Sequence, residues 1–164
     1  MFGPSFAHRK LLLDLYGRGV AAVHGRPVVR DWLTARGTPG PYHLVAIGKA
    51  AAAMTAGALE AAGDQLQSGL VITRYGHMDE AVYLDPRLLC LESSHPLPDA
   101  QSMAAGNALL LFLESTPRDA RFLFLISGGT SSLVEAPVAG VTPEELRRLN
   151  LWLLGSGLAI ADIN

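Results

Sequence analysis

The sequence lacks the features that mark several classes of protein. It has a single cysteine, Cys90, so it forms no internal disulfide and fits a reducing compartment. Its 13 lysines and arginines are balanced by 15 aspartates and glutamates, and the net charge of −2 leaves no basic footprint for nucleic acid. No run approaches the roughly 18 uncharged apolar residues that cross a membrane. These absences predict a cytoplasmic protein that binds neither nucleic acid nor a membrane.

Several well-known catalytic and nucleotide-binding motifs are missing as well. No GxxxxGK[ST] motif occurs, which excludes a P-loop nucleotide enzyme. No GxSxG elbow surrounds Ser127 or Ser131, and no cysteine and histidine spacing suits zinc. Residues 17–22 match GxGxxA, but they lie in a helical pattern and follow no strand. We therefore interpret that match as chance.

What the sequence does contain is an alternation of short apolar runs with helical segments. The apolar runs predict four strands, at residues 44–47, 70–73, 88–91 and 122–126. Helical spacing or capping signals predict helices at residues 7–23, 27–37, 50–62, 99–114 and 142–154. Gly25 is expected to end the first helix. The alternation predicts an α/β fold, with a doubly wound, mainly parallel sheet, helices on both faces and an N-terminal helical segment.

The most informative stretch is Ser127-Gly128-Gly129-Thr130-Ser131-Ser132, which follows directly on the fourth apolar run. A continuous apolar run is typical of a strand covered on both faces. Glycines let the backbone turn sharply and approach a ligand, and hydroxyls add donors. Because ligands of open α/β sheets bind just beyond the carboxyl ends of the strands, the stretch predicts a site for phosphate or carboxylate. The structural alternative is a tight turn capped by serine.

Lys49 is the second candidate. It follows a buried strand and Gly48, and we expect it in the first turn of the next helix. A cation there opposes the helix dipole, and a bound anion would resolve the conflict because the helix N-terminus and the ammonium would then act together. A solvated lysine at the end of the sheet is the alternative.

Two further loops leave the same end of the predicted sheet. His95 lies in a proline-rich loop after the third strand and could contact substrate or act as acid or base. Arg74 or His77, after the second strand, could reach an acidic ligand. Structural or exposed positions remain the alternatives for all three, and we expect Asp99 to cap the following helix rather than to bind a metal.

These segments resemble, in the same order, those of the type-2 glycerate kinases, also called the MOFRL or DUF4147 family. The resemblance rests on residues 45–51, 71–77, 94–99 and 125–133, and it extends over residues 140–164. It implies phosphorylation of D-glycerate at its 2-hydroxyl by ATP with Mg2+, in a cleft between two domains. Lys49 matches the lysine that the family places in that cleft, and the resemblance makes it the expected catalytic residue. The substrate- and phosphate-binding residues expected are Gly48, Arg74, His95, Ser127, Gly128, Gly129, Thr130, Ser131 and Ser132.

The chain departs from the family pattern in two ways. Thr130 stands where many members have a third glycine, and the sequence ends at Asn164, whereas family members continue with a C-terminal domain that supplies a further cleft arginine. We therefore expect residues 1–164 to form one domain, with half of an active site and little activity alone. The alternatives are a non-catalytic anion-binding module, whose uncovered apolar surface could drive a homodimer, and a hydroxypyruvate reductase, as some relatives are labelled.

Overall fold

A four-stranded sheet lies at the centre of the structure, a computed structural model that describes residues 6–37 and 40–163. Its strands are β1 (Tyr42–Ile47), β2 (Leu66–Arg74), β3 (Leu88–Ser93) and β4 (Phe122–Ile126). All neighbouring strands are parallel, in the order β3-β2-β1-β4. The predicted α/β fold with a parallel sheet is confirmed.

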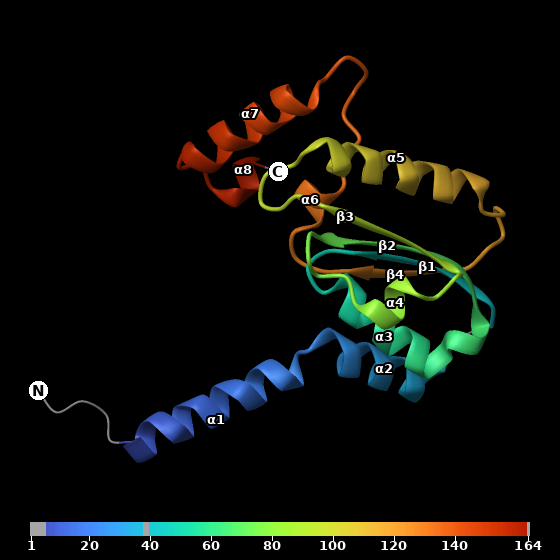
Figure 1. Ribbon diagram of the computed structural model, residues 1–164, viewed down its shortest axis with the longest axis vertical. Coiled ribbons are helices and arrows are strands. Elements are labelled where there is room, and N and C mark those ends of the chain that lie inside the picture. The colour runs from blue at the N-terminus through green and yellow to red at the C-terminus, as the bar shows by residue number, and fades with distance from the viewer. Residues whose placement is uncertain (1–5, 38–39, 164) are drawn as a thin grey trace, which may run out of the picture.

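Helices cover both faces of this sheet (Figure 1). One face carries α2 (Gly25–Arg36), α3 (Ala51–Ala62), a short 3-10 turn (Gly63–Gln65) and α4 (Glu80–Tyr83). The other face carries α5 (Ala100–Ser115), with α6 (Thr130–Leu133) beside it. Three helices extend beyond these layers: α1 (Phe6–Ala22), α7 (Pro143–Gly155) and α8 (Ile160–Ile163). None of the described helices combines the length and the apolar character needed to span a bilayer.

Two predicted helix starts are confirmed at the level of single hydrogen bonds. The Asp99 carboxylate accepts from the N–H of Ser102 and caps α5. Thr142 and Glu145 form a capping box at the start of α7, with Pro143 in its first turn. Side-chain acceptors satisfy amides that have no partner inside a helix, so these positions could be predicted from local sequence alone.

The prediction that Gly25 ends the first helix is wrong. Gly25 is the first residue of α2, and His24 caps that helix. The reason is close packing between α2 and α3. A Cβ on Gly25 would lie 2.7 Å from Cγ of Met54, and one on Gly57 would lie 2.1 Å from the carbonyl oxygen of Arg26. Both glycines are thus required by tertiary contact, which a local pattern cannot reveal.

The prediction that both faces of the fourth strand are covered is wrong. β4 is an edge strand, and although Leu125 is buried, Phe124 and Ile126 are 51% and 54% exposed. The physical reason is the position of α5, which packs on β2 and β3 and leaves the far part of β4 uncovered. Apolar composition alone does not distinguish an edge strand from a central one.

The order of the strands brings two loops together. From β1 the chain moves outward to β2 and β3, and α5 then returns it to the other side of β1, where β4 is added. The direction of winding therefore reverses between β1 and β4. In open α/β sheets, ligands bind beyond the carboxyl ends of the strands at such a reversal. The loops after β1 and β4, which carry Lys49 and residues 127–132, meet at this point.

Candidate functional site

Backbone hydrogen bonds join the loop after β1 to the loop after β4. The N–H of Ser127 donates to the carbonyl of Ile47 (2.9 Å), and the N–H of Lys49 donates to the carbonyl of Gly128 (3.0 Å). Gly48 lies between them with a φ of +123°, and a Cβ there would lie 2.4 Å from the carbonyl oxygen of Ser127. Only glycine permits this approach. The approach in turn fixes Lys49 beside Gly128.

Two hydroxyls of the loop hold the loop itself. The Ser127 hydroxyl accepts a hydrogen bond from the N–H of Ala50 (3.0 Å) and donates to the carbonyl of Ile47 (3.3 Å). The Thr130 hydroxyl donates to the carbonyl of Ser127 (2.8 Å). The capped-turn alternative thus accounts for the hydroxyls of Ser127 and Thr130.

The other two hydroxyls differ in their surroundings. The buried Ser132 hydroxyl lies 2.7 Å from Nδ1 of His95 and donates to the carbonyl of Gly129 (3.3 Å). Ser131 is exposed, and its hydroxyl has no partner among the described residues. Ser132 therefore holds the His95 ring, and Ser131 is the hydroxyl of this loop left available to a ligand.

The prediction that Lys49 lies in the first turn of the next helix is wrong. Lys49 lies in the turn before α3, because α3 begins at Ala51. The first amides of this helix already have partners, since the N–H of Ala51 donates to the carbonyl of Gly48 (3.1 Å). The exposed lysine side chain follows the glycine pair instead. Its Cε would lie 3.8 Å from a Cβ on Gly128, and its Cγ 3.4 Å from a Cβ on Gly129.

The loop after β3 brings His95 to the same place. A Cβ on Gly129, where φ is +98°, would lie 3.2 Å from Cε1 of His95. The imidazole and the Lys49 side chain therefore both flank the α-carbon of Gly129, and glycine keeps the space between them open. The N–H groups of Gly128 and Gly129 donate no hydrogen bond within the described residues. We call Lys49, His95, Gly128 and Gly129 the Lys49 cluster.

The Lys49 cluster carries positive charge that no carboxylate of the described residues neutralises. Neither Lys49 nor Arg74 belongs to an ion pair in that part of the chain. Burial lowers the pKa of His95, and the charges of Lys49 and Arg74 lower it further. The imidazole is therefore mainly neutral near pH 7. An anion bound here would lie near the positive charges of Lys49 and Arg74 and would favour protonation of His95.

The neighbouring ends of β2 and β3 are organised around carboxylates. The Tyr75 hydroxyl donates to the Asp99 carboxylate (2.7 Å), and partial burial together with this bond raises the pKa of Tyr75 to about 12. The Glu92 carboxylate accepts from the N–H groups of His77 (3.1 Å) and Met78 (3.0 Å). Of the two residues predicted to reach an acidic ligand, Arg74 thus lies within electrostatic reach of His95. His77 belongs to a turn whose backbone amides are hydrogen-bonded to the Glu92 carboxylate.

The donors of this site suit an anion better than a cation. Mg2+ in proteins is held by oxygen ligands, chiefly carboxylates. Within residues 6–37 and 40–163, no group of three or more histidine, cysteine, aspartate or glutamate side chains is placed to hold a metal ion. Asp99 and Glu92 are engaged by Tyr75 and by backbone amides. These residues do not form a magnesium site by themselves.

Two contacts of the site have no signal in the sequence. Ser132 and His95 are 37 residues apart, and Tyr75 and Asp99 are 24 apart. Only the order of the strands makes these pairs neighbours. The sequence could indicate only that these residues lie near a polar site, because a serine or histidine beside glycines at the end of a strand favours one.

Comparison with known proteins finds a matching family and several relatives of this chain. The profile of a family described as "Domain of unknown function (DUF4147)" matches residues 11–164. D-Glycerate 2-kinase of Thermotoga maritima is 34% identical over 164 residues, which are 100% of this chain and 38% of that protein. A protein of Agrobacterium vitis that carries the name of a hydroxypyruvate reductase is 36% identical over 156 residues, or 95% of this chain and 34% of that protein.

A solved structure gives the same result. The crystal structure of glycerate kinase from Thermotoga maritima superposes with a TM-score of 0.81 at 33% identity, over 94% of this chain and 36% of that one. The chain thus spans little more than a third of the length of these relatives.

Proposed function

We propose that this chain forms one side of a glycerate 2-kinase active site. The premise is that the chain belongs to the DUF4147 family and is homologous to the N-terminal region of the glycerate 2-kinases. The reaction proposed is the phosphorylation of D-glycerate at its 2-hydroxyl by ATP, which gives 2-phosphoglycerate. The side formed here binds the anionic groups of substrate and product through the Lys49 cluster.

The observation that carries this proposal is the convergence of three loops at the reversal of winding between β1 and β4. Lys49, His95 and Gly129 meet there, and no carboxylate of the described residues neutralises the charge of Lys49. The Lys49 ammonium neutralises a phosphate or carboxylate, while the free N–H groups of Gly128 and Gly129 donate to its oxygens. Ser131 adds a hydroxyl, and Arg74 adds charge at longer range.

His95 is proposed to handle the proton of the substrate. Since the Ser132 hydroxyl donates to the carbonyl of Gly129, its oxygen is free to accept from Nδ1–H of His95, and the Nε2 lone pair remains available. A neutral imidazole can take the 2-hydroxyl proton of D-glycerate as that oxygen forms its bond to the γ-phosphorus of ATP, while the bond between this phosphorus and the bridging oxygen breaks and ADP leaves. Ser132 acts here only by holding the ring.

Catalysis requires a complementary part. Phosphoryl transfer depends mainly on positioning and on charge neutralisation around the transferring group, which needs donors on more than one side. The residues described here provide one side, without a magnesium site. In this proposal ATP supplies the phosphoryl group, and ATP and Mg2+ are held chiefly by the region that relatives have beyond the match. The chain alone binds anions and turns over poorly.

Calorimetry with 2-phosphoglycerate and D-glycerate tests the binding half of the proposal. Lys49→Met should weaken 2-phosphoglycerate binding by about tenfold or more, because a charge-assisted contact is worth roughly 1.5–3 kcal/mol. His77→Ala is the matched control, since His77 is exposed at the same end of the sheet and should leave the affinity unchanged. Equal affinities for the wild type and Lys49→Met would remove Lys49 from the site.

A coupled assay for 2-phosphoglycerate tests the incomplete active site separately. We expect the 164-residue chain to show almost no ATP-dependent turnover, even when calorimetry shows binding. Turnover near the roughly 1–100 s⁻¹ typical of kinases would contradict the requirement for a complementary part.

The name carried by the Agrobacterium vitis relative favours a second candidate, reduction of hydroxypyruvate with a nicotinamide cofactor. The formal GxGxxA match at residues 17–22 falls inside α1, with no strand before it in the described chain, so it does not have the context of a dinucleotide site. Oxidation of NADH or NADPH that depends on hydroxypyruvate would favour this candidate over the kinase.

A further inference from the structure

The segment between β3 and α5 carries His95 and closes on the carboxylate of Asp99. One carboxylate oxygen accepts from the N–H of Ser102 (3.0 Å) and from its hydroxyl (3.3 Å), which caps α5. The other oxygen accepts from the hydroxyl of Tyr75 (2.7 Å), in the loop after β2. The carboxylate also accepts from the N–H of Ser94, the residue before His95. A helix cap requires only the contact with Ser102, so capping does not account for the other two bonds.

The Asp99 carboxylate does not act on His95 through its charge. Burial alone would raise the pKa of Asp99, but the hydrogen bonds that it accepts, first among them that from Tyr75, lower the pKa below its usual value. The group is therefore ionised throughout the range in which histidine titrates. The lowered pKa of His95 itself is caused by burial and by the charges of Lys49 and Arg74. Asp99 thus reaches His95 through the backbone.

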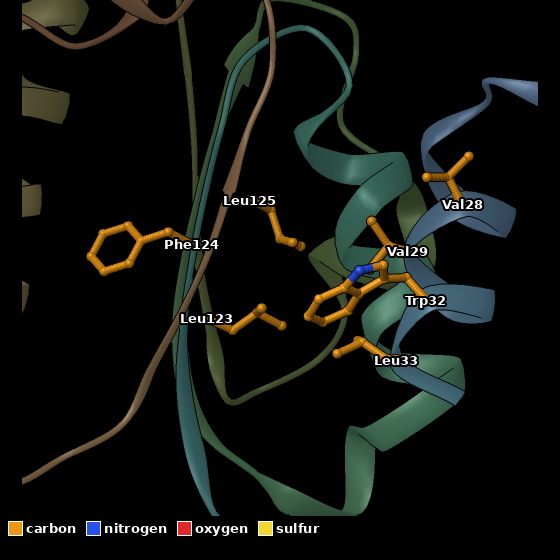
Figure 2. A pocket seen from close by; sticks show the side chains of 7 residues that line it. All are labelled: Val28, Val29, Trp32, Leu33, Leu123, Phe124 and Leu125. Atoms are coloured by element: carbon orange, nitrogen blue, oxygen red, sulfur yellow. The ribbon is translucent and has the colours of Figure 1, made fainter. Parts of the chain in front are cut away.

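The glycine-serine loop that His95 faces, residues 127–132, is held at both of its ends. Before the loop, β4 pairs with β1, and Figure 2 shows the buried side chain of Leu125 pointing toward α2. After the loop, the N–H of Glu135 donates to the carbonyl of Ser102 (3.0 Å). The glycine-serine loop therefore has a fixed position relative to the first turn of α5.

The first turn of α5 is the common anchor of the glycine-serine loop and of His95. It holds the chain after the loop through the carbonyl of Ser102, and it holds the segment of His95 through Asp99. Within the described chain, the imidazole itself makes one hydrogen bond, between its Nδ1 and the Ser132 hydroxyl (2.7 Å). One hydrogen bond leaves a ring free to turn about it. The place of Nε2 therefore depends on where the backbone of His95 is fixed.

We propose that Asp99, held by the hydroxyl of Tyr75, is a positioning residue that places Nε2 of His95 at the substrate. This inference rests on the proposed function, because it concerns the residue that takes the substrate proton there. Asp99 acts through the backbone of His95, and Tyr75 acts by holding the second carboxylate oxygen. Proton transfer requires the acceptor within hydrogen-bond reach, so a displaced imidazole impairs this step while Lys49 still binds the anion.

Nuclear magnetic resonance of the histidines in the whole chain, without ligand, tests the positioning. Asp99→Ser keeps a cap, because serine caps a helix about as well as aspartate, but one hydroxyl cannot also accept from Tyr75 and Ser94. We expect the pKa of His95 to rise toward its usual 6.5, because a loosened ring is less buried and lies farther from Lys49. Asp99→Asn keeps polar atoms at both carboxylate positions and should restore most of the wild-type behaviour.

Calorimetry with sulfate at pH 7.5 and pH 5.5 gives a second readout. The wild type should bind more tightly at pH 5.5, and Asp99→Ser should lose about half or more of this gain. Its affinity at pH 7.5, which depends on Lys49 and the glycine amides, should change by less than about twofold. Thr142→Ala is the matched control. It removes the N-cap of the other capping box, at the start of α7, and should leave the pKa of His95 and the gain unchanged.

Circular dichroism verifies that the variants fold. A wild-type pKa of His95 and a wild-type gain in Asp99→Ser overturn the inference, because Asp99 then only caps α5. Equal shifts in Asp99→Ser and Thr142→Ala also overturn it, since loss of stability explains both.

Tyr75→Phe decides the question if Asp99→Ser does not fold. Tyr75 is 49% exposed, and this variant removes only the hydroxyl. A rise in the pKa of His95 supports the inference, and a wild-type pKa contradicts it. Failure of the proposed function is distinguishable, because the wild type would then not bind 2-phosphoglycerate, whereas the pKa comparison is made without ligand.

Discussion

At the carboxyl end of the sheet, the half beyond β2 and β3 differs from the half beyond β1 and β4. The difference lies in whether charged and polar groups have partners within the described chain. Beyond β2 and β3, Glu92 accepts from two backbone amides and Asp99 accepts from Tyr75 and Ser102, so local partners complete that half. Beyond β1 and β4, the Lys49 ammonium and the amides of Gly128 and Gly129 have no such partner in the described chain. The difference is the reason for proposing the site beyond β1 and β4, where donors have no partner, and not beyond β2 and β3.

The largest expected difference between the two halves concerns their glycines. Gly48→Ala would place a Cβ 2.4 Å from the Ser127 carbonyl oxygen, whereas a Cβ on Gly76, at φ +72°, meets nothing within 4 Å. We expect Gly48→Ala to lower the free energy of unfolding by about 3 kcal/mol or more, and Gly76→Ala by only about 1 kcal/mol. Urea denaturation measures both. Equal losses would show that the junction of β1 and β4 is not closely packed.

The second expected difference separates backbone strain from ligand binding. Gly129 and Gly140 have nearly equal φ values, +98° and +95°, but a Cβ on Gly140 meets nothing within 4 Å. Both alanine variants should lose about 1–2 kcal/mol of stability. Only Gly129→Ala fills the space between His95 and Lys49, and it should weaken 2-phosphoglycerate binding by about tenfold. If Gly140→Ala weakens 2-phosphoglycerate binding as much as Gly129→Ala does, the loss of affinity comes from backbone strain and not from a filled binding site.

A third comparison uses adjacent serines. Ser132→Ala removes the partner of the His95 ring and should lower the free energy of unfolding by about 1 kcal/mol. Ser131→Ala should change stability by less than about 0.5 kcal/mol, because its hydroxyl is exposed. Thermal unfolding distinguishes the two. The opposite ranking would mean that Ser132 does not hold His95.

The smallest expected effect is a dependence of anion binding on pH. In the free protein, burial, Lys49 and Arg74 lower the pKa of His95 below its usual 6.5. A bound anion favours the protonated ring, so binding takes up a proton and strengthens as pH falls from 7.5 toward 5.5. Sulfate is the suitable probe because its own charge stays constant over this range. We expect a severalfold rise in affinity for the wild type and none for His95→Gln, and equal slopes would exclude His95.

Local sequence predicted the elements of the fold well, but it did not predict how they are arranged. The strand at Phe122–Ile126 and the capping residues Asp99 and Thr142 were predictable because short-range physics decides them. The exposure of β4 was not, since it depends on where α5 returns the chain. The role of Gly25 was hidden for a similar reason, because Met54 lies on a different helix.

The candidate site was predictable as a set of residues and not as a geometry. Lys49 and the glycines were found because parallel strands share one carboxyl end. The commitment of the Ser127 hydroxyl to Ala50 joins positions 77 residues apart, and no spacing rule reveals it. The sequence therefore overestimated the number of hydroxyls left for a ligand.

Nuclear magnetic resonance of the histidine side chains tests the central claim most directly, that the Lys49 cluster binds the anionic group of the substrate. The pKa of His95 and the signals of His77 are followed with and without 2-phosphoglycerate, in the wild type and in Lys49→Met. We predict a saturable rise in the pKa of His95, unmoved His77 signals, and loss of the effect in Lys49→Met. Equal responses of both histidines, or a response that Lys49→Met leaves intact, would contradict the claim.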